Sequence, residues 1–135
     1  MVIKMKDTKW SDNLKNELLT EINKIDFSVL KENYNRLLFR QKHTLIEYED
    51  DEYADISFFN KEMFGDDVYL KNELLKQVQY TIKGLTNAPY DEQKKINILL
   101  DEFSILIQAI GISLGLQPET YQRRLNQKIY GKNKT

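Results

Sequence analysis

Apolar residues recur every three or four positions in five stretches of this 135-residue chain, and this spacing is what most limits its fold. A period of 3.6 residues places such side chains on one face of an α-helix, so each stretch predicts a helix that buries one side. The sequence therefore predicts a mainly α fold, a compact bundle of about five helices. The periodic positions are Leu14, Leu18, Ile22 and Ile25; Leu30, Tyr34, Leu37 and Leu38; Leu70, Leu74, Val78, Ile82 and Leu85; Ile96, Leu99, Leu100, Phe103, Leu106, Ile107 and Ile110; and Tyr121, Leu125 and Ile129.

Polar caps and helix breakers give the expected ends of these helices. Side chains of Ser and Asp accept hydrogen bonds from free N–H groups of a first turn, and proline suits the first helical position. The first two helices are expected to form an antiparallel hairpin with its turn at residues 26–28. The expected helix starts are Ser11, Ser28, Asp66 or Asp67, Tyr90 or Asp91, and Pro118.

Length and composition indicate one helical domain over residues 1–135. The chain is 41% hydrophobic and 30% charged, with only five Gly and two Pro, which is typical of a globular rather than a disordered protein. The N-terminus lacks the apolar run of a signal peptide, so we expect a cytoplasmic protein. The longest apolar stretch, residues 103–116, is too short to span a membrane and is expected to be a core helix.

The helical period fails in residues 43–56, which we expect to form either a loop or a short hairpin. Residues 57–64 are expected to add one or two helical turns, ended by Gly65. Four large apolar side chains in this stretch are expected to bury and to hold it on the core: Phe58, Phe59, Met63 and Phe64.

Residues 47–67 concentrate the negative charge of the protein. They contain nine acidic residues and one lysine, a net charge of −8, whereas residues 1–46 carry +3 and residues 68–135 carry +4. The net charge of −1 therefore conceals a strong local field that attracts positively charged surfaces.

This acidic stretch is the candidate partner-binding site. The simpler interpretation is a solvated loop, as most charge runs are. Two tyrosines among the acids favour binding, because tyrosine supplies contact area at low entropic cost. The candidate residues are Glu47, Tyr48, Glu49, Asp50, Asp51, Glu52, Tyr53, Asp55, Asp66 and Asp67.

The residue types argue against an enzyme, and we expect neither a metal nor a cofactor. There is no cysteine, and the single histidine, His43, is expected to be an ordinary boundary residue. The acidic stretch lacks the central glycine and the twelfth-position Glu of an EF-hand loop. The pair Asp91 and Glu92 suits a first helical turn, and the pair Asp101 and Glu102 suits a solvated helix face.

Nucleic acid is not an expected partner. The C-terminal bases Arg123, Arg124, Lys128, Lys132 and Lys134 could contact phosphates. A nucleic-acid binder, however, usually has a basic excess over the whole domain, which this chain lacks.

The chain resembles known proteins in two respects. In size, charge layout and helicity it is similar to the immunity proteins of interbacterial competition of the contact-dependent inhibition type, which are small cytoplasmic proteins that bind one cognate toxin and block it. Its C-terminal third is also loosely similar to a family of small helical bacterial proteins of unknown function. That similarity rests on residues 101–103, 110–112, 125–126 and 130–131, and it implies no activity.

Three hypotheses follow. The first is a non-enzymatic immunity or inhibitor protein, a monomer or weak homodimer that neutralises a toxin, expected to be a nuclease with a basic cleft. The alternative is a structural or regulatory homodimer with Tyr121, Leu125 and Ile129 along its seam. An enzyme requires carboxylates from different helices to meet in one pocket.

Overall fold

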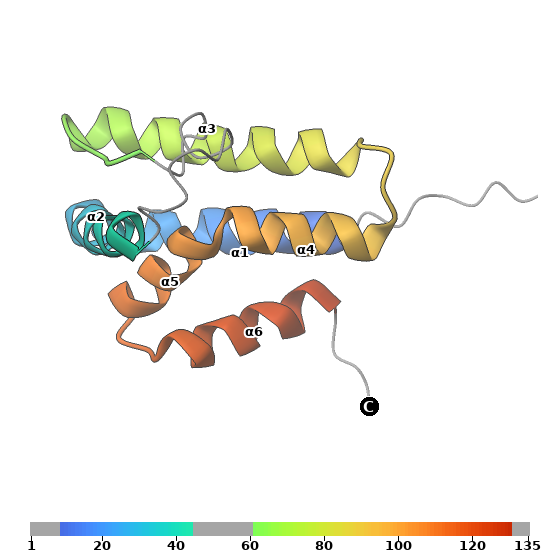
Figure 1. Cartoon of the computed structure of the whole chain (residues 1–135). Helices are drawn as coiled ribbons and strands as arrows, with labels where there is room; N and C mark the ends of the chain where they lie inside the picture. The colour runs from blue at the N-terminus through green and yellow to red at the C-terminus, as the bar shows by residue number, and fades with distance from the viewer. Residues whose placement is uncertain (1–8, 45–60, 131–135) are drawn as a thin grey trace, which may run out of the picture.

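The computed structural model describes residues 9–44 and 61–130, which form six helices and, within those ranges, no strand (Figure 1). The mainly α fold and the compact helical bundle are therefore confirmed, with one helix more than expected. The helices are α1 (Lys9–Lys24), α2 (Phe27–Thr44), α3 (Asp67–Thr86), α4 (Glu92–Glu102), α5 (Ser104–Ser113) and α6 (Pro118–Tyr130).

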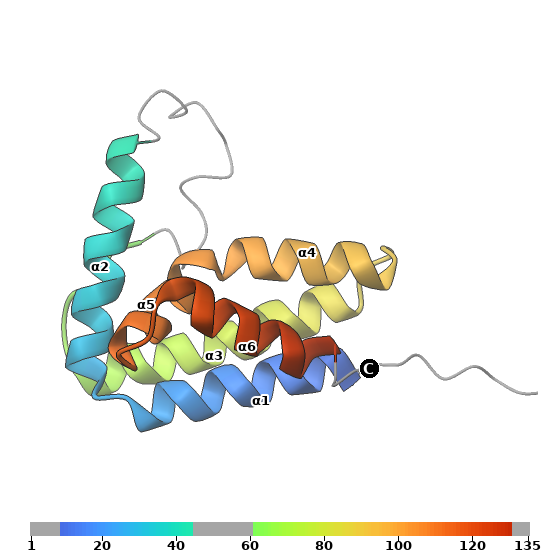
Figure 2. The ribbon, with the colours of Figure 1, turned by 90° about the horizontal axis from the view of Figure 1, so that it is seen from below.

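Four of the helices lie side by side. In Figures 1 and 2, α3 and α6 both run antiparallel to α1, and α4 runs back along α3. Helix α2 crosses one end of this set, so the predicted antiparallel hairpin of the first two helices is wrong. The two helices do not lie along each other because α2 packs mainly against α5 and only slightly against α1.

The periodic apolar positions make up the core. Every one of them is buried in the described structure except Leu37, Leu85 and Leu100, which pack partly buried against the others. Burying each large aliphatic side chain stabilises the fold by about 1.5–3 kcal/mol, so these positions hold the helices together. The prediction that the periodic apolar positions form the buried sides of the helices is therefore confirmed.

The helix that we expected from residue 90 or 91 to residue 110 is two helices, α4 and α5, bent by 61°. Phe103 lies at the break and is fully buried. Helix α5 is buried on nearly all sides, at Ile105, Leu106, Ile107, Ala109, Ile110 and Gly111. A straight continuation would keep one side of α4 and α5 in water, whereas the bend places α5 between α2 and α6.

The predicted helix starts are partly confirmed. Asp66 caps α3 by accepting a hydrogen bond from the Tyr69 N–H at 3.1 Å, and Asp91 caps α4 in the same way. Ser11 is not a cap, because α1 begins at Lys9. Asp26, not Ser28, precedes α2 and accepts from the Ser28 N–H at 3.0 Å.

Two further predictions concern the connection into α3 and the start of α6. Residues 61–64 are not helical, so the predicted turns in 57–64 are wrong for that part, and residues 57–60 lie outside the described residues. Pro118 is the first residue of α6, as expected.

In the described part of the chain no single helix is long and apolar enough to cross a membrane, although α4 and α5 taken together meet that criterion by length and composition.

Candidate functional site

Most of the predicted partner-binding residues lie outside the part of the chain that the structure describes: Glu47, Tyr48, Glu49, Asp50, Asp51, Glu52, Tyr53 and Asp55. Asp66 and Asp67 are described, and each has a local structural role. The Asp66 carboxylate caps α3, and the Asp67 carboxylate forms an ion pair with Lys31 on α2. Both side chains remain partly accessible at the start of α3.

Residues 63–67 are held against α2 by two side chains that stand one helical turn apart. The Asn35 amide donates to the Met63 carbonyl oxygen and accepts from the Met63 N–H, both at 2.8 Å. Lys31 donates to the Gly65 carbonyl oxygen at 3.4 Å in addition to its contact with Asp67. Because four contacts hold this short segment, the end of the acidic stretch enters α3 at a fixed position on the body.

Two large apolar side chains beside these contacts face water. Phe64 is 72% exposed and Val68 is 69% exposed, whereas the side chain of Met63, whose backbone Asn35 contacts, is buried. The expectation that Met63 buries is confirmed, the same expectation for Phe64 is wrong, and Phe58 and Phe59 lie outside the described residues. Exposed apolar groups close in sequence to charged ones are a feature of contact sites, so Phe64 and Val68 extend the candidate surface beyond the predicted residues.

A second group of charged residues lies between α1 and α6, and sequence reasoning missed it. Glu17 and Glu21 on α1 are buried, with side chains 5% and 2% exposed. Arg124 on α6 donates to Glu21 at 2.9 Å, and the Lys128 ammonium lies 3.2 Å from Glu17. We call Glu17, Glu21, Tyr121, Arg124 and Lys128 the α1–α6 charge cluster.

The α1–α6 charge cluster is built from matching spacings on two antiparallel helices. Glu17 and Glu21 stand four residues apart on α1, and Arg124 and Lys128 stand four residues apart on α6. These spacings were visible in the sequence, but only the fold places the two helices in contact. Its carboxylates are occupied by ion pairs, and the described residues hold no group of three acids or histidines that could bind a metal.

Two buried tyrosines resist ionisation. Burial, the charge of Glu17 and a 3.0 Å hydrogen bond from the Tyr121 hydroxyl to Glu17 raise the pKa of Tyr121 well above its ordinary value of 10.0. Burial first, and then the charge of Glu102, raises the pKa of Tyr34 in the same direction. Both groups are therefore neutral in the folded protein at pH values where an unfolded tyrosine loses its proton.

Folding stability is expected to fall at alkaline pH for this reason. The contribution of Tyr121 is fully present below its unfolded pKa of 10.0 and is lost as the pH rises, because the unfolded state releases the proton first. Urea unfolding across this range should show that Tyr121→Phe flattens the decline by about 1.4 kcal/mol per pH unit. The exposed Tyr80→Phe is the control, and an equal effect of the two substitutions would contradict the assignment.

The structure also places the other residues that the sequence analysis singled out. Tyr121, Leu125 and Ile129 are buried in the core, so the predicted homodimer seam is wrong, because the same spacing serves packing within one chain. Asp91 caps α4 and Glu92 lies in its first turn, and Asp101 and Glu102 are exposed on the same helix, as expected. His43 lies in α2, but its side chain is outside the described residues.

Comparison with known proteins identifies relatives of this chain. The family described as Mg296 protein matches residues 8–128. The "Uncharacterized protein MG296 homolog" of Mycoplasma pneumoniae is 32% identical over 116 residues, which cover 86% of this chain and 90% of that protein. The "Uncharacterized protein MG296" of Mycoplasma genitalium is 32% identical over 108 residues, covering 80% of this chain and 84% of that protein.

No solved structure matches the chain. The family match and the two Mycoplasma relatives support the predicted similarity to a small helical bacterial family. They do not support the resemblance to toxin-immunity proteins.

Proposed function

The chain belongs to the Mg296 protein family, and from this premise we propose that it is a non-enzymatic protein that binds and neutralises a basic protein partner. The printed names of its relatives assign no activity, so the proposal rests on this chain's own residues. The observation that carries it is the net charge of −8 on residues 47–67 in a protein whose net charge is −1. Such a local field favours capture of a positively charged surface.

The contacts on α2 support this surface. Lys31 and Asn35 fix residues 63–67 at the end of the acidic stretch, so Asp66 and Asp67 stand at a defined place on the body. Phe64 and Val68 lie exposed beside them. Apolar side chains next to charged ones are the composition of protein interfaces, in which buried apolar groups supply affinity and charges speed association.

A nucleic-acid-processing toxin is the partner class we favour. The basic cleft of a nuclease is built to bind phosphates, and a row of carboxylates can occupy the same cationic side chains. Tyrosines among the acids would add contacts of the kind that nucleic-acid bases make with such clefts. In this role the chain would be the immunity protein that the sequence resembles.

The buried charged groups of the described structure have structural partners. Glu17 and Glu21 belong to the α1–α6 charge cluster, and the buried Lys95 donates to the Thr86 carbonyl oxygen at 2.6 Å. Each of these groups joins two parts of the fold. Their charges stabilise contacts between helices, so they are not poised for proton transfer to a substrate.

A salt-dependent binding experiment tests the proposal. A tagged protein is used to recover partners from its native host at low and high salt, and the retained protein is then purified for kinetic measurement. Reversing Asp50 and Asp51 to lysine is expected to lower the association rate constant about tenfold or more and to reduce its salt dependence. The dissociation rate constant should change less.

The control reverses two exposed acids elsewhere, Asp12→Lys and Glu119→Lys, which changes the net charge by the same amount. This variant should associate nearly as fast as the unaltered protein if the acidic stretch forms the interface. Equal slowing by both variants would mean that only the total charge matters. Unchanged association of the Asp50 and Asp51 variant would exclude the acidic stretch from the interface.

A further inference from the structure

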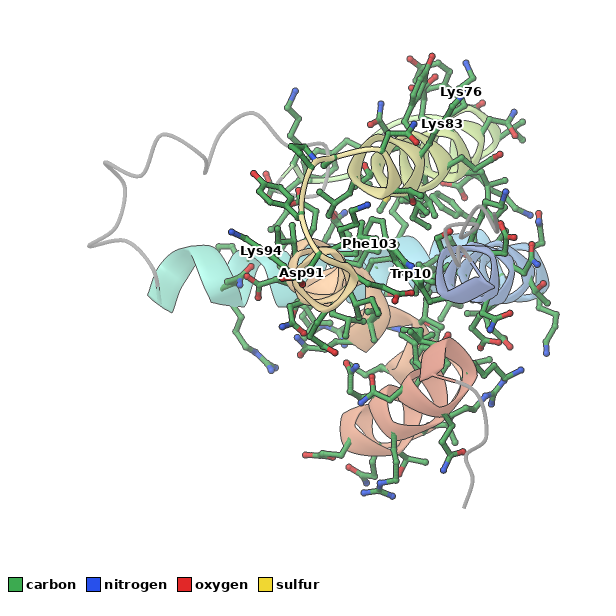
Figure 3. All side chains as sticks on the ribbon, turned by 90° about the vertical axis from the view of Figure 1, so that its right-hand side faces the viewer. Trp10, Lys76, Lys83, Asp91, Lys94 and Phe103 are labelled. Carbon is green, nitrogen blue, oxygen red and sulfur yellow. The ribbon has the colours of Figure 1, made fainter. Side chains whose placement is uncertain are left out.

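Helix α3 lies at the edge of the molecule, and the side of it that faces away from the other helices is exposed along most of its length (Figure 3). On this outward side, from the cap onward, six residues follow one another at alternating steps of three and four positions. This spacing places side chains in a straight line along a helix, as in the seam where two helices pair. We call these residues the α3 seam: Asp66, Tyr69, Glu73, Lys76, Tyr80 and Lys83. All are exposed except Glu73, which is partly exposed.

The order of charges along the α3 seam is self-complementary. Both acids lie in its first half, both lysines lie in its second half, and each half has one tyrosine. The midpoint of the seam falls between residues 74 and 75. The residues that stand at equal distances on either side of it are Asp66 and Lys83, Tyr69 and Tyr80, and Glu73 and Lys76.

We infer that two copies of this chain pair antiparallel along the α3 seam, about a two-fold axis at its midpoint. In such a pair each residue of one copy faces its counterpart in the other, and every contact occurs twice. Asp66 then faces Lys83 of the second copy, and the Tyr69 ring faces a second tyrosine ring. Opposite charges attract across the seam, and paired aromatic rings add to the contact.

The outer residues of the seam are available for these contacts. Tyr69 is 62% exposed and Tyr80 is 71% exposed, and exposed tyrosines lose little side-chain freedom on binding. Lys83 has no ion pair within the described residues. Asp66 caps α3 through Oδ2 alone, so its other oxygen can accept from a lysine of the second copy.

The central residues of the seam already contact each other within one chain. The Lys76 ammonium lies 3.7 Å from Glu73, a loose surface pair that contributes little by itself. At the midpoint of the dimer the same two residues of the second copy lie beside them. Each of the four charges then has two neighbours of opposite sign and one of like sign, which is a net attraction. The pair within one chain therefore becomes part of a network, which is worth more than an isolated pair.

The same charges argue against other occupants of the seam. A parallel second copy in the same register would place each charge opposite itself. Slipping the antiparallel pair by seven residues in either direction would retain only one of its two kinds of ion pair. An acidic helix or a nucleic acid would meet Asp66 and Glu73 as well as the lysines, and a basic helix would meet the lysines as well as the acids. An antiparallel second copy supplies the opposite charge at each charged position.

The contact is small, and the dimer is expected to be weak. The seam spans seventeen positions, about 26 Å along the axis, and involves one helix from each copy. We expect it to bury less than about 1,200 Å² in total, which corresponds to a Kd of about 1 μM or higher. The inference is separate from the proposed function, because the occupant is a second copy of this chain rather than a basic partner. It also differs from the α6 seam expected from the sequence, which is buried.

Sedimentation equilibrium of the full chain, from about 1 μM to 1 mM, measures the dimer directly. Lys76→Glu and Glu73→Lys are each expected to raise the Kd about tenfold or more, because each gives all four central charges the same sign. Mixing these two variants should restore association, since the acids of one copy then face the lysines of the other. Arg123→Glu, an equal charge reversal at an exposed site on α6, should leave the Kd unchanged. Circular dichroism should show the same helicity for all variants.

Disulfide formation tests the register, because the chain has no cysteine of its own. A mixture of the variants Tyr69→Cys and Tyr80→Cys is expected to cross-link under oxidation. Each variant alone should cross-link far less, because the two copies of either position stand about 16 Å apart along the axis, beyond the reach of a disulfide.

Four results would overturn the inference. The first is a protein that stays monomeric up to about 1 mM. The second is equal weakening of the dimer by Lys76→Glu and Arg123→Glu, and the third is cross-linking of each cysteine variant with itself as fast as in the mixture. The fourth is a monomer whose α3 amide NMR signals shift on addition of an acidic helical peptide or an oligothymidylate, which would assign the α3 seam to that class of partner.

Discussion

Arg124→Ala is expected to lower the free energy of unfolding by about 3 kcal/mol, which is the cost of leaving a buried carboxylate without its partner. Arg124 makes the 2.9 Å ion pair with Glu21, whose side chain is 2% exposed. Lys24, 3.5 Å from the same oxygen, is largely in water and screens the remaining charge only weakly. The other Glu21 oxygen is buried without a hydrogen-bond partner in the described structure, so it offers the carboxylate no second contact when Arg124 is removed.

Urea unfolding monitored by circular dichroism measures this effect. The neighbouring Arg123→Ala is the matched control, since Arg123 is exposed and should contribute less than about 0.5 kcal/mol. The double variant Glu21→Leu with Arg124→Met should recover most of the lost stability, because apolar residues of similar size can replace a buried ion pair. Equal effects of the two arginine substitutions would show that the α1–α6 charge cluster does not hold α6.

Gly111→Val is expected to cost about 3 kcal/mol, because it adds bulk where α5 and α6 are already in contact. A Cβ at Gly111 would lie 3.1 Å from the Cβ of Tyr121, which is tighter than an ordinary contact. The α6 backbone fixes the position of the Tyr121 Cβ, so a change of side-chain rotamer cannot move this atom away. Helix α6 would therefore have to move, and its ion pairs with α1 would lengthen.

Gly84→Ala is the control, because nothing lies within 4 Å of a Cβ built at Gly84 in α3. There the alanine should stabilise the protein by about 1 kcal/mol through its higher helix propensity. Thermal or urea unfolding of the two variants should thus give shifts of opposite sign. Stabilisation by Gly111→Val would mean that the close approach of α5 and α6 does not persist in solution.

The candidate surface was predictable from the sequence only in part. The charge of residues 47–67 follows from counting residues, and Asp66 was correctly expected as a cap of α3. The exposure of Phe64 was not predictable, because burial depends on which helix covers a side chain. The contacts of Lys31 and Asn35 with residues 63–67 join positions about thirty residues apart, and no local pattern specifies such pairs.

The sequence by itself determined where most of the helices lie and which side of each is buried. These properties depend on neighbours three or four positions apart and on caps, as at Asp91 before α4, so they can be calculated from a short window of sequence. The tertiary structure decided how the helices meet. The break at Phe103, the placement of α2 across one end of the other helices and the ion pair between Glu21 and Arg124 depend on contacts between distant segments. Their geometry follows from which apolar faces can be covered together, and that choice is made only when the whole chain packs.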